Sequence, residues 1–278
     1  MKNLFKISII GFLVFGFLAQ TVLGAANTLS ATFNKDNSER LTAADSADLS
    51  RTGSFTIDFW IKFTTVNTLS FIVDKTSPTS GDKGYTIYHQ ASDNTMHFVT
   101  SQDGTGQDKN VSWTPSTATW YVLRLTYNAA TDEGKFYAGT SCPGDLVGTT
   151  VGHTDPTDGA NVFYLGAQKD NETNAARLFN GLMDEVRIWG EVHTTDDQCT
   201  QLNGNETNLL AVWMMNGTSG DCATTSLEDR GDVTDPAGAG ADDLTNVNTV
   251  QCTTDVPFGA AVAAVILKRR RIGSFIIE

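Results

Sequence analysis

The acidic side chains of this 278-residue chain are not spaced as catalysis along a strand would require. Hydrolysis of a glycosidic bond needs two carboxylates that face the same bond, and side chains on a strand share a face only at every second position. Asp184 and Glu185 are adjacent and should therefore point to opposite faces. No HxxEH, GxSxG or P-loop pattern occurs, and the histidines fall in unrelated segments (His89, His97, His153 and His193). We expect no catalytic site; a hydrolase with carboxylates from separate loops is the alternative.

Tryptophan rings are the second group of side chains that could bind a ligand, because an exposed ring can stack on a sugar. Trp60, Trp120 and Trp189 lie in apolar, strand-like segments, which favours a place in the core. Trp113 lies in the more polar segment 111–115 and is the best candidate for a ligand-binding ring. A core position for Trp113 is the alternative.

The N-terminal residues predict export. Lys2 and Lys6 precede an apolar run over residues 7–19, and residues 22–26 supply small side chains for cleavage. We interpret residues 1–24 as a signal peptide. An uncleaved membrane anchor is the alternative, although the run is shorter than the roughly 20 residues of a spanning helix. We therefore expect an extracellular or cell-surface protein.

The cysteines are even in number and widely spaced (Cys142, Cys199, Cys222 and Cys252). No CxxC pair occurs, so a zinc ribbon is not indicated. In an oxidising compartment two disulfides are the simplest interpretation. Three pairings are open, and of these we expect Cys142–Cys199 and Cys222–Cys252, with four unpaired buried thiols as the alternative.

The charge of the chain excludes one class of partner. The formal net charge is −13 and the isoelectric point is about 4.6. A nucleic-acid-binding protein needs a basic face to contact phosphates, so we expect no nucleic acid partner. An acidic surface with few charged residues suits cations or neutral glycans.

Strand follows strand between residues 30 and 189. Apolar residues alternate with polar ones over residues 54–63, which is typical of a half-buried strand. The other predicted strands cover residues 69–74, 84–89, 95–100, 120–127, 134–139, 161–166 and 181–189. This spacing, with polar turns between the strands, predicts an all-β protein with two antiparallel sheets in a sandwich or jelly roll. One short helix is expected over residues 194–202.

Separated motifs resemble one known family. Residues 45–49 and 53–62 (GSFTIDFWIK) are similar to the opening of a laminin-G-like, concanavalin A-like jelly-roll domain of the pentraxin-like type, and residues 120–127 with 135–137 resemble its central hairpin. FNGLMDEVRIW at residues 179–189 resembles the closing strand nearly residue for residue. Residues 205–213 resemble the segment that often follows. The resemblance covers roughly residues 28–215 and implies one jelly-roll domain there.

The resemblance implies a binding function. Such modules are mostly non-catalytic and bind glycans or proteins at cell surfaces, often with a structural calcium ion. It implies Asn34, Asp36 and Asp184 as calcium ligands, because the terminal strands of a jelly roll lie close together; acids that only solvate turns are the alternative. Glucanases of the same architecture carry an E-x-D-x-x-E motif, which this chain lacks. We expect a non-catalytic recognition module whose partner is a glycan or a cell-surface protein, with a glycoside hydrolase or a self-assembling surface protein as alternatives.

The C-terminal residues divide into two parts. Residues 216–255 are rich in Gly, Asp and Thr and are expected to be irregular. Residues 256–278 hold a 12-residue apolar run and then Lys268, Arg269, Arg270 and Arg271. As a helix, that run would span only about 18 Å, short of the roughly 30 Å hydrocarbon core. The order resembles a bacterial sorting tail, through which alone we expect membrane contact; a frayed end is the alternative.

Overall fold

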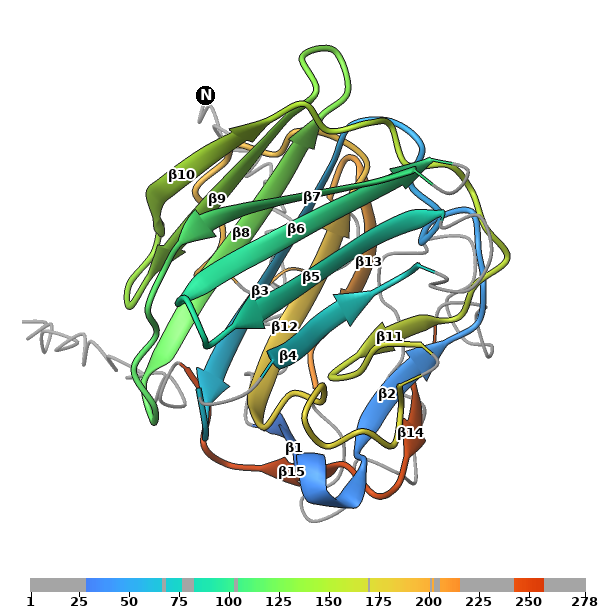
Figure 1. Cartoon of the computed structure of the whole chain (residues 1–278). Coiled ribbons are helices and arrows are strands. Elements are labelled where there is room, and N and C mark those ends of the chain that lie inside the picture. The colour runs from blue at the N-terminus through green and yellow to red at the C-terminus, as the bar shows by residue number, and fades with distance from the viewer. Residues whose placement is uncertain are drawn as a thin grey trace, which may run out of the picture.

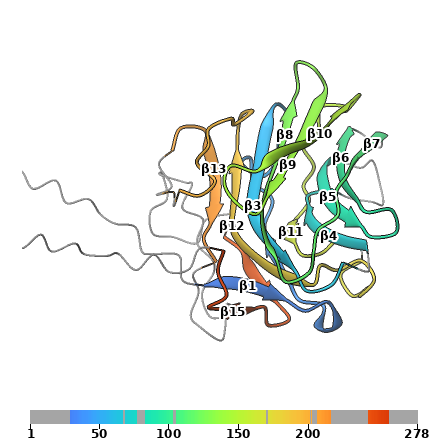
Figure 2. The ribbon, with the colours of Figure 1, turned by 90° about the vertical axis from the view of Figure 1, so that its left-hand side faces the viewer.

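The structure is a computed structural model that describes residues 29–66, 69–76, 83–102, 105–169, 171–200, 202, 206–215 and 243–257. Its strands form two antiparallel sheets packed face to face, which confirms the predicted jelly-roll sandwich (Figures 1 and 2). Sheet A contains, in spatial order, β10 (Asp145–Val151), β9 (Glu133–Gly139), β8 (Trp120–Asn128), β3 (Phe55–Phe63), β12 (Gly181–Trp189), β1 (Ser30–Phe33) and β15 (Gln251–Thr253), with β13 (Leu209–Trp213) beside β12.

Sheet B forms the other layer, and its outer face is in front in Figure 1. It contains, in spatial order, β14 (Thr245–Val247), β2 (Arg40–Ala43), β11 (Phe163–Leu165), β4 (Leu69–Asp74), β5 (Gly84–Gln90), β6 (Thr95–Gln102) and β7 (Thr105–Ser112). A short 3-10 turn, η1 (Lys35–Asn37), connects β1 to β2. The first and last described strands, β1 and β15, are neighbours in sheet A.

The predicted alternation of β3 is confirmed. This strand crosses the middle of sheet A, and its apolar residues are buried in the core between the sheets (Phe55, Ile57, Phe59, Ile61 and Phe63). Asp58 and Trp60 alternate with them and are buried as well. They are buried because the chain after β12 covers the outer face of this sheet, where Trp60 Nε1 donates to the carbonyl of Gln198 at 3.3 Å.

Aromatic rings from both sheets fill the core. Phe55 of sheet A lies 4.9 Å from Tyr85 and 6.0 Å from Phe98, both of sheet B, measured between ring centroids. Burying one such ring contributes about 1.5–3 kcal/mol, and tilted or edge contacts add to this. The two sheets are therefore held at a fixed separation, and each presents its second face outward.

One prediction about the chain after β12 is wrong. The sequence predicts a helix over residues 194–202, but no α-helix occurs among the described residues, and the described part of this segment is irregular with a short turn. Residues 216–255 are predicted to be irregular, and the described part of that segment includes two three-residue strands, β14 and β15. These strands pair with β2 and β1 and extend both sheets.

Candidate functional site

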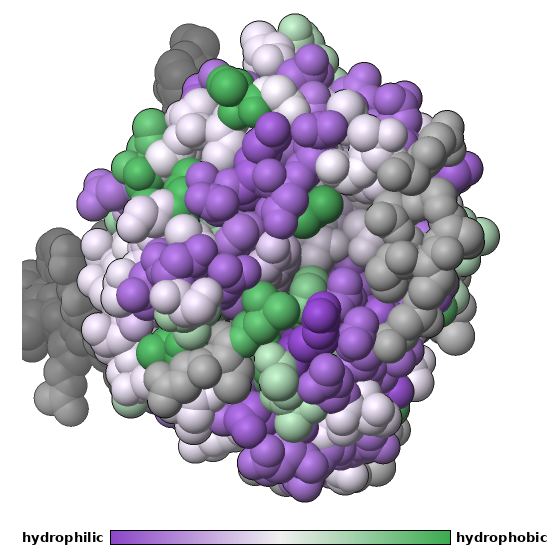
Figure 3. Space-filling model, viewed as in Figure 1, coloured by the Kyte–Doolittle hydropathy of each residue, from purple (hydrophilic) through white to green (hydrophobic). Residues whose placement is uncertain are grey.

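A groove of about 340 Å³ lies on the outer face of sheet B. Figure 3 shows this face hollowed near its middle, with hydrophobic residues in green among hydrophilic residues in purple. The described residues that line the groove are Leu69, Phe71, Thr76, Thr86, Tyr88, Gln90, Val99, Ser101, Gln168 and Arg177. Most of them stand on three neighbouring strands, β4, β5 and β6.

Strand geometry explains why these residues meet. On β5 the groove residues Thr86, Tyr88 and Gln90 alternate with Tyr85, Ile87 and His89, which are buried on the core side, as the two-residue period of a strand requires. The sheet register places Tyr88 directly opposite Phe71 of β4 and His97 of β6. One face of sheet B thus carries a row of three rings across three strands.

Tyr88 is held firmly at the centre of this row. Its ring stacks on His97 with centroids 4.3 Å apart and planes 12° from parallel, and its centroid lies 5.0 Å from that of Phe71. Its hydroxyl donates to Asp108 Oδ2 at 2.7 Å, and His97 Nδ1 lies 2.8 Å from the other oxygen of the same carboxylate. The ring is therefore fixed before any ligand arrives, so little conformational entropy is lost on binding.

The pKa values agree with this arrangement. Burial raises the pKa of Tyr88 above 10.0, and the hydrogen bond to Asp108 raises it further. Burial alone would raise the pKa of Asp108, but the hydrogen bonds from His97 and Tyr88 outweigh it and lower the pKa below 3.8. At neutral pH Tyr88 is a neutral phenol and Asp108 an anion, which is the pairing that the 2.7 Å hydrogen bond needs.

A buried carboxylate lies behind the groove lining. Asp74 is fully buried, and its Oδ1 accepts the hydroxyl of Thr86 at 2.5 Å and the hydroxyl of Thr76 at 2.7 Å. Oδ1 also accepts the Thr76 N–H at 3.3 Å, and Oδ2 accepts the Lys169 N–H at 2.8 Å. Burial raises the pKa of Asp74 above 3.8, and the four hydrogen bonds oppose that rise.

Polar groups stand at the rim of the groove. Arg177 Nη1 donates to Gln168 Oε1 at 3.1 Å, which uses one of the five N–H donors of the guanidinium. Gln90 Nε2 donates to Ser92 and Asp93, both at 3.1 Å, so its amide orientation is fixed. An apolar centre with a few oriented polar groups is the usual composition of a small-ligand site.

The three predicted calcium ligands are not brought together. The pairing of β1 with β12 leaves Asn34 beyond one end of the paired residues and Asp184 beyond the other, about 13 Å apart along the strands. Asn34 Oδ1 accepts the N–H of Asp36 at 3.0 Å within η1, and the Asp36 carboxylate pairs with Lys35. Within the described parts of the chain, no three His, Cys, Asp or Glu side chains form a group that could hold a metal ion.

Asp184 has its own structural role, because it is fully buried and its Oδ1 accepts the Glu185 N–H at 2.9 Å. Calcium binding therefore stays a prediction without assigned ligands. Since a ligand that binds only the native state stabilises it, calcium would raise the melting temperature above that in EDTA. Equal melting temperatures would contradict calcium binding.

Trp113, the predicted ligand-binding ring, packs against the core. It is half-buried, and its ring lies 5.3–6.1 Å from the rings of Tyr121, Phe136 and Phe63. It follows β7 and does not line the groove on the outer face of sheet B. The alternative interpretation from the sequence, a place in the core, describes its contacts better.

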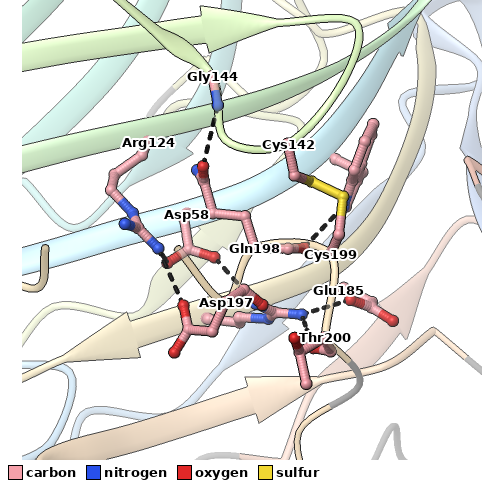
Figure 4. The surroundings of a disulfide bond; sticks show 11 residues. Asp58, Arg124, Cys142, Gly144, Glu185, Asp197, Gln198, Cys199 and Thr200 are labelled. Carbon is pink, nitrogen blue, oxygen red and sulfur yellow. Dashed lines mark hydrogen bonds and ion pairs between the residues drawn. A yellow bond between two sulfur atoms is a disulfide. The ribbon is translucent and has the colours of Figure 1, made fainter. Parts of the chain in front are cut away.

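A charged network lies on the outer face of sheet A, beneath the segment 190–202 (Figure 4). Asp58 lies 3.4 Å from Arg124 and 3.6 Å from Arg187, and Arg187 also pairs with Glu185 at 2.5 Å. All four side chains are buried. Glu185 and Arg187 thus form an ion pair in the interior, not at the surface. Carboxylates neutralised in this way are structural, because a buried charge without a partner is costly.

The disulfide Cys142–Cys199 closes this region, as predicted. It joins the loop between β9 and β10 to the segment after β12, and Gln198 Oε1 accepts the Gly144 N–H of that loop at 3.2 Å (Figure 4). Cys252 is buried. Its predicted partner Cys222 lies outside the described residues, so the second disulfide stays a prediction.

Two further predictions fall on residues that the structure does not describe. The predicted signal peptide, residues 1–24, lies outside the described residues, as does the predicted tail beyond residue 257. Among the residues that are described, no helix is long and apolar enough to cross a membrane.

The groove was not predicted from the sequence. Its residues come from β4, β5, β6 and two later loop positions, Gln168 and Arg177, so no local motif marks it. One signal was available: on the predicted strand 84–89 the residues between the core-facing ones are Thr86 and Tyr88, a polar and an aromatic residue on the outward face.

Two solved structures are similar to this chain in fold. A provisionally assigned carbohydrate-binding protein of Bacteroides ovatus matches with a TM-score of 0.58 and 17% identity over 82% of this chain; the chain spans 60% of that protein's length. A heptameric pentraxin of Limulus polyphemus matches with a TM-score of 0.47 and 16% identity over 66% of this chain and 87% of its own. These similarities concern the fold alone.

Sequence comparison identifies the family. No curated protein sequence matches the chain significantly. The family model described as the concanavalin A-like lectin/glucanases superfamily matches residues 35–197, which is more than half of the chain and includes β2 to β12. The chain therefore belongs to the concanavalin A-like lectin/glucanase superfamily.

Proposed function

We propose that this protein is a non-catalytic carbohydrate-binding module whose ligand site is the groove on the outer face of sheet B. The observation that carries the proposal is Tyr88, an aromatic ring that lines the groove and is fixed in place by His97 and Asp108. Sugars present apolar C–H faces that pack on aromatic rings, and hydroxyl groups that need oriented polar partners.

The rest of the groove suits the same ligand class. Gln168 and Arg177 can donate hydrogen bonds to sugar oxygens, and Gln90 Oε1 can accept one from a sugar hydroxyl, while Leu69 and Phe71 add apolar surface. The Bacteroides ovatus protein with the same fold has a provisional carbohydrate-binding assignment, which supports the choice of ligand. A protein ligand at a cell surface is the outcome to consider if no glycan binds.

The absence of catalysis is part of the proposal. No carboxylate is among the described residues that line the groove, whereas glycoside hydrolysis uses two that flank the scissile bond. Asp74, behind the lining, is fully buried, and its oxygens already accept four hydrogen bonds. Release of reducing sugar from polysaccharides by the purified protein would contradict this part.

We also propose that the protein is exported and acts outside the cell or at its surface. The predicted signal peptide supports this, and so does the disulfide between Cys142 and Cys199, because disulfides persist mainly in oxidising compartments. Detection of the protein only in the cytoplasm, with residues 1–24 still attached, would contradict export.

A glycan array with three proteins tests the binding site. We expect the wild-type protein to bind a defined set of glycans and Tyr88→Ala to weaken binding about 10-fold or more. Tyr137→Ala is the matched control, since Tyr137 is a half-buried tyrosine on β9 of sheet A, outside the groove. Equal binding by wild type and Tyr88→Ala, with unchanged melting temperatures, would place the ligand elsewhere.

A further inference from the structure

The hydroxyl groups of Thr76 and Thr86 share one acceptor beneath the groove. Both donate to Asp74 Oδ1, at 2.7 and 2.5 Å, and both residues line the groove. The pairing of β4 with β5 explains why the Thr86 hydroxyl reaches this carboxylate, because Asp74 lies directly opposite Thr86. Thr76 follows two residues after Asp74.

Each hydroxyl has a single hydrogen and two lone pairs. The two hydroxyl oxygens lie 3.1 Å apart, but a carboxylate is the stronger acceptor, so both hydrogens point to Asp74. Two backbone N–H groups, of Thr76 and Lys169, also point to this carboxylate. Burial raises the pKa of Asp74 and so favours its neutral acid, but all four neighbouring groups are donors that point at its oxygens, and this geometry fits the anionic form at pH 8. The hydroxyl oxygens are then left with lone pairs only.

We propose that Asp74 is a positioning residue that makes the Thr76–Thr86 part of the groove accept, and never donate, hydrogen bonds. This inference rests on the proposed glycan-binding function. It defines the ligand more closely: a sugar whose hydroxyl hydrogen points toward this pair of threonines. An ether, a fluorine or a carboxylate at that point of the ligand cannot donate and is rejected.

The variant Asp74→Asn inverts this polarity without changing the shape of the side chain. Hydroxyl groups can turn to accept a hydrogen bond, whereas a backbone N–H cannot, so the asparagine oxygen should take the place of Oδ2, 2.8 Å from the Lys169 N–H. The longer 3.3 Å contact of the Thr76 N–H is then lost. The amide NH₂ then faces the two hydroxyl oxygens and donates to them. Both hydroxyl hydrogens are released and can donate into the groove.

Binding of fluorinated sugars at pH 8 tests whether Thr76 and Thr86 accept or donate hydrogen bonds in the groove. The probes are methyl β-D-glucopyranoside and methyl β-D-galactopyranoside, each with one hydroxyl at a time replaced by fluorine, which accepts hydrogen bonds weakly and donates none. Fluorine in place of the hydroxyl that donates to the two threonines should weaken binding to the wild type about 3- to 10-fold. The same fluorinated sugar should bind Asp74→Asn as well as the unmodified sugar does. An identical fluorine pattern for both proteins would overturn the proposal.

Two threonine variants separate polarity from packing. Thr86→Val has nearly the same volume but no acceptor, so it should lose the preference for the donating hydroxyl, while Thr86→Ser should keep it. A merely structural role for Thr86 would change melting temperature in both variants and leave the fluorine pattern of the folded protein unchanged.

Neutron diffraction tests the inference without any sugar. In wild-type crystals we expect the hydroxyl deuterium atoms of Thr76 and Thr86 to point at Asp74, and in Asp74→Asn crystals to point into the groove. Deuterium atoms that point into the groove in the wild type would overturn the inference. If neither glycoside binds, the glycan-binding proposal loses support, while the neutron result still decides the polarity.

Discussion

The rings of Trp189 and His193 stack with centroids 3.7 Å apart and planes 7° from parallel. Trp189 ends β12, and its Nε1 donates to the buried carboxylate of Asp58 at 2.9 Å, while His193 Nε2 lies 2.9 Å from Asp197. This stack directs the chain back across sheet A, so that the following residues cover the charged network. We expect the stability of the sandwich to depend on that cover.

Removal of Arg187 should be strongly destabilising. Its guanidinium pairs with Asp58 and Glu185 and donates to the carbonyls of Asp197 and Thr200. In Arg187→Met two buried carboxylates lose this partner, and we expect the free energy of unfolding to fall by about 3–5 kcal/mol. Urea denaturation measures this loss of unfolding free energy.

The control for Arg187→Met is Lys35→Met, which breaks the pair of Lys35 with the exposed Asp36. Such surface pairs contribute about 0–1 kcal/mol. If both variants lose the same small amount, the network is not structurally important.

The disulfide should stabilise the protein because it lowers the conformational entropy of the unfolded chain. Cys142 and Cys199 are 57 residues apart in the sequence, and closing a loop of that length is worth about 4 kcal/mol in the chain-entropy model. We expect the double variant Cys142→Ser, Cys199→Ser to lose about that much in urea denaturation. Addition of a reductant should destabilise the wild type and have less effect on this variant. A wild-type midpoint unaffected by complete reduction would contradict the prediction.

Gly84 cannot be replaced by alanine without strain. Its φ is +106°, and a Cβ atom there would lie 2.2 Å from the carbonyl oxygen of Lys75. We expect Gly84→Ala to destabilise the protein by about 2–4 kcal/mol. Gly53→Ala is the matched control, because nothing lies within 4 Å of its added Cβ. Similar melting temperatures for the two variants would refute the prediction.

His153 should make the protein less stable in mild acid. Its ring nitrogens contact the hydroxyls of Thr100 and Thr150, and burial lowers its pKa from 6.5 to about 4. Above pH 6.5 the histidine is neutral in both states. Between pH 6.5 and 4 the unfolded chain takes up a proton that the native protein does not, so stability falls as the pH decreases, by about 2 kcal/mol.

Urea denaturation at several pH values measures this loss. In His153→Gln, which keeps a hydrogen-bonding side chain but does not titrate, the fall between pH 6.5 and 4 should be smaller by the same amount. Parallel stability curves for the two proteins would show that His153 is not responsible.

The sequence predicted the strands that are marked by apolar residues. β3 and β4 agree with their predicted ranges to within a residue. β3 is marked by an apolar residue at every second position, and β4 by a short apolar run. β7 and β10 were not predicted. They lie at the edges of the two sheets, and all their residues are exposed or only half-buried. Edge strands bury little, so little apolar patterning marks them.

The site and the covering segment depend on tertiary contacts that no local pattern encodes. The predicted helix over residues 194–202 does not form because the carbonyls of Thr195, Asp197 and Thr200 accept hydrogen bonds from Arg124 and Arg187. These arginines stand on strands far away in the sequence. The family resemblance predicted the fold, but only the register of β4, β5 and β6 places Phe71, Tyr88 and His97 in one row.

The pairing of β1 with β15 determines how the domain would respond to a pulling force. Ser30 begins β1 and lies opposite Thr253, which ends β15, so the chain enters and leaves at the same end of an antiparallel pair. Tension between these two points loads the hydrogen bonds one at a time and peels β15 away, instead of shearing the pair as a whole. Asp255 follows β15 and accepts hydrogen bonds from Lys62 and Trp120, so these two contacts would be the first to break. As a tether, this domain would yield at its last strand while the groove stays folded.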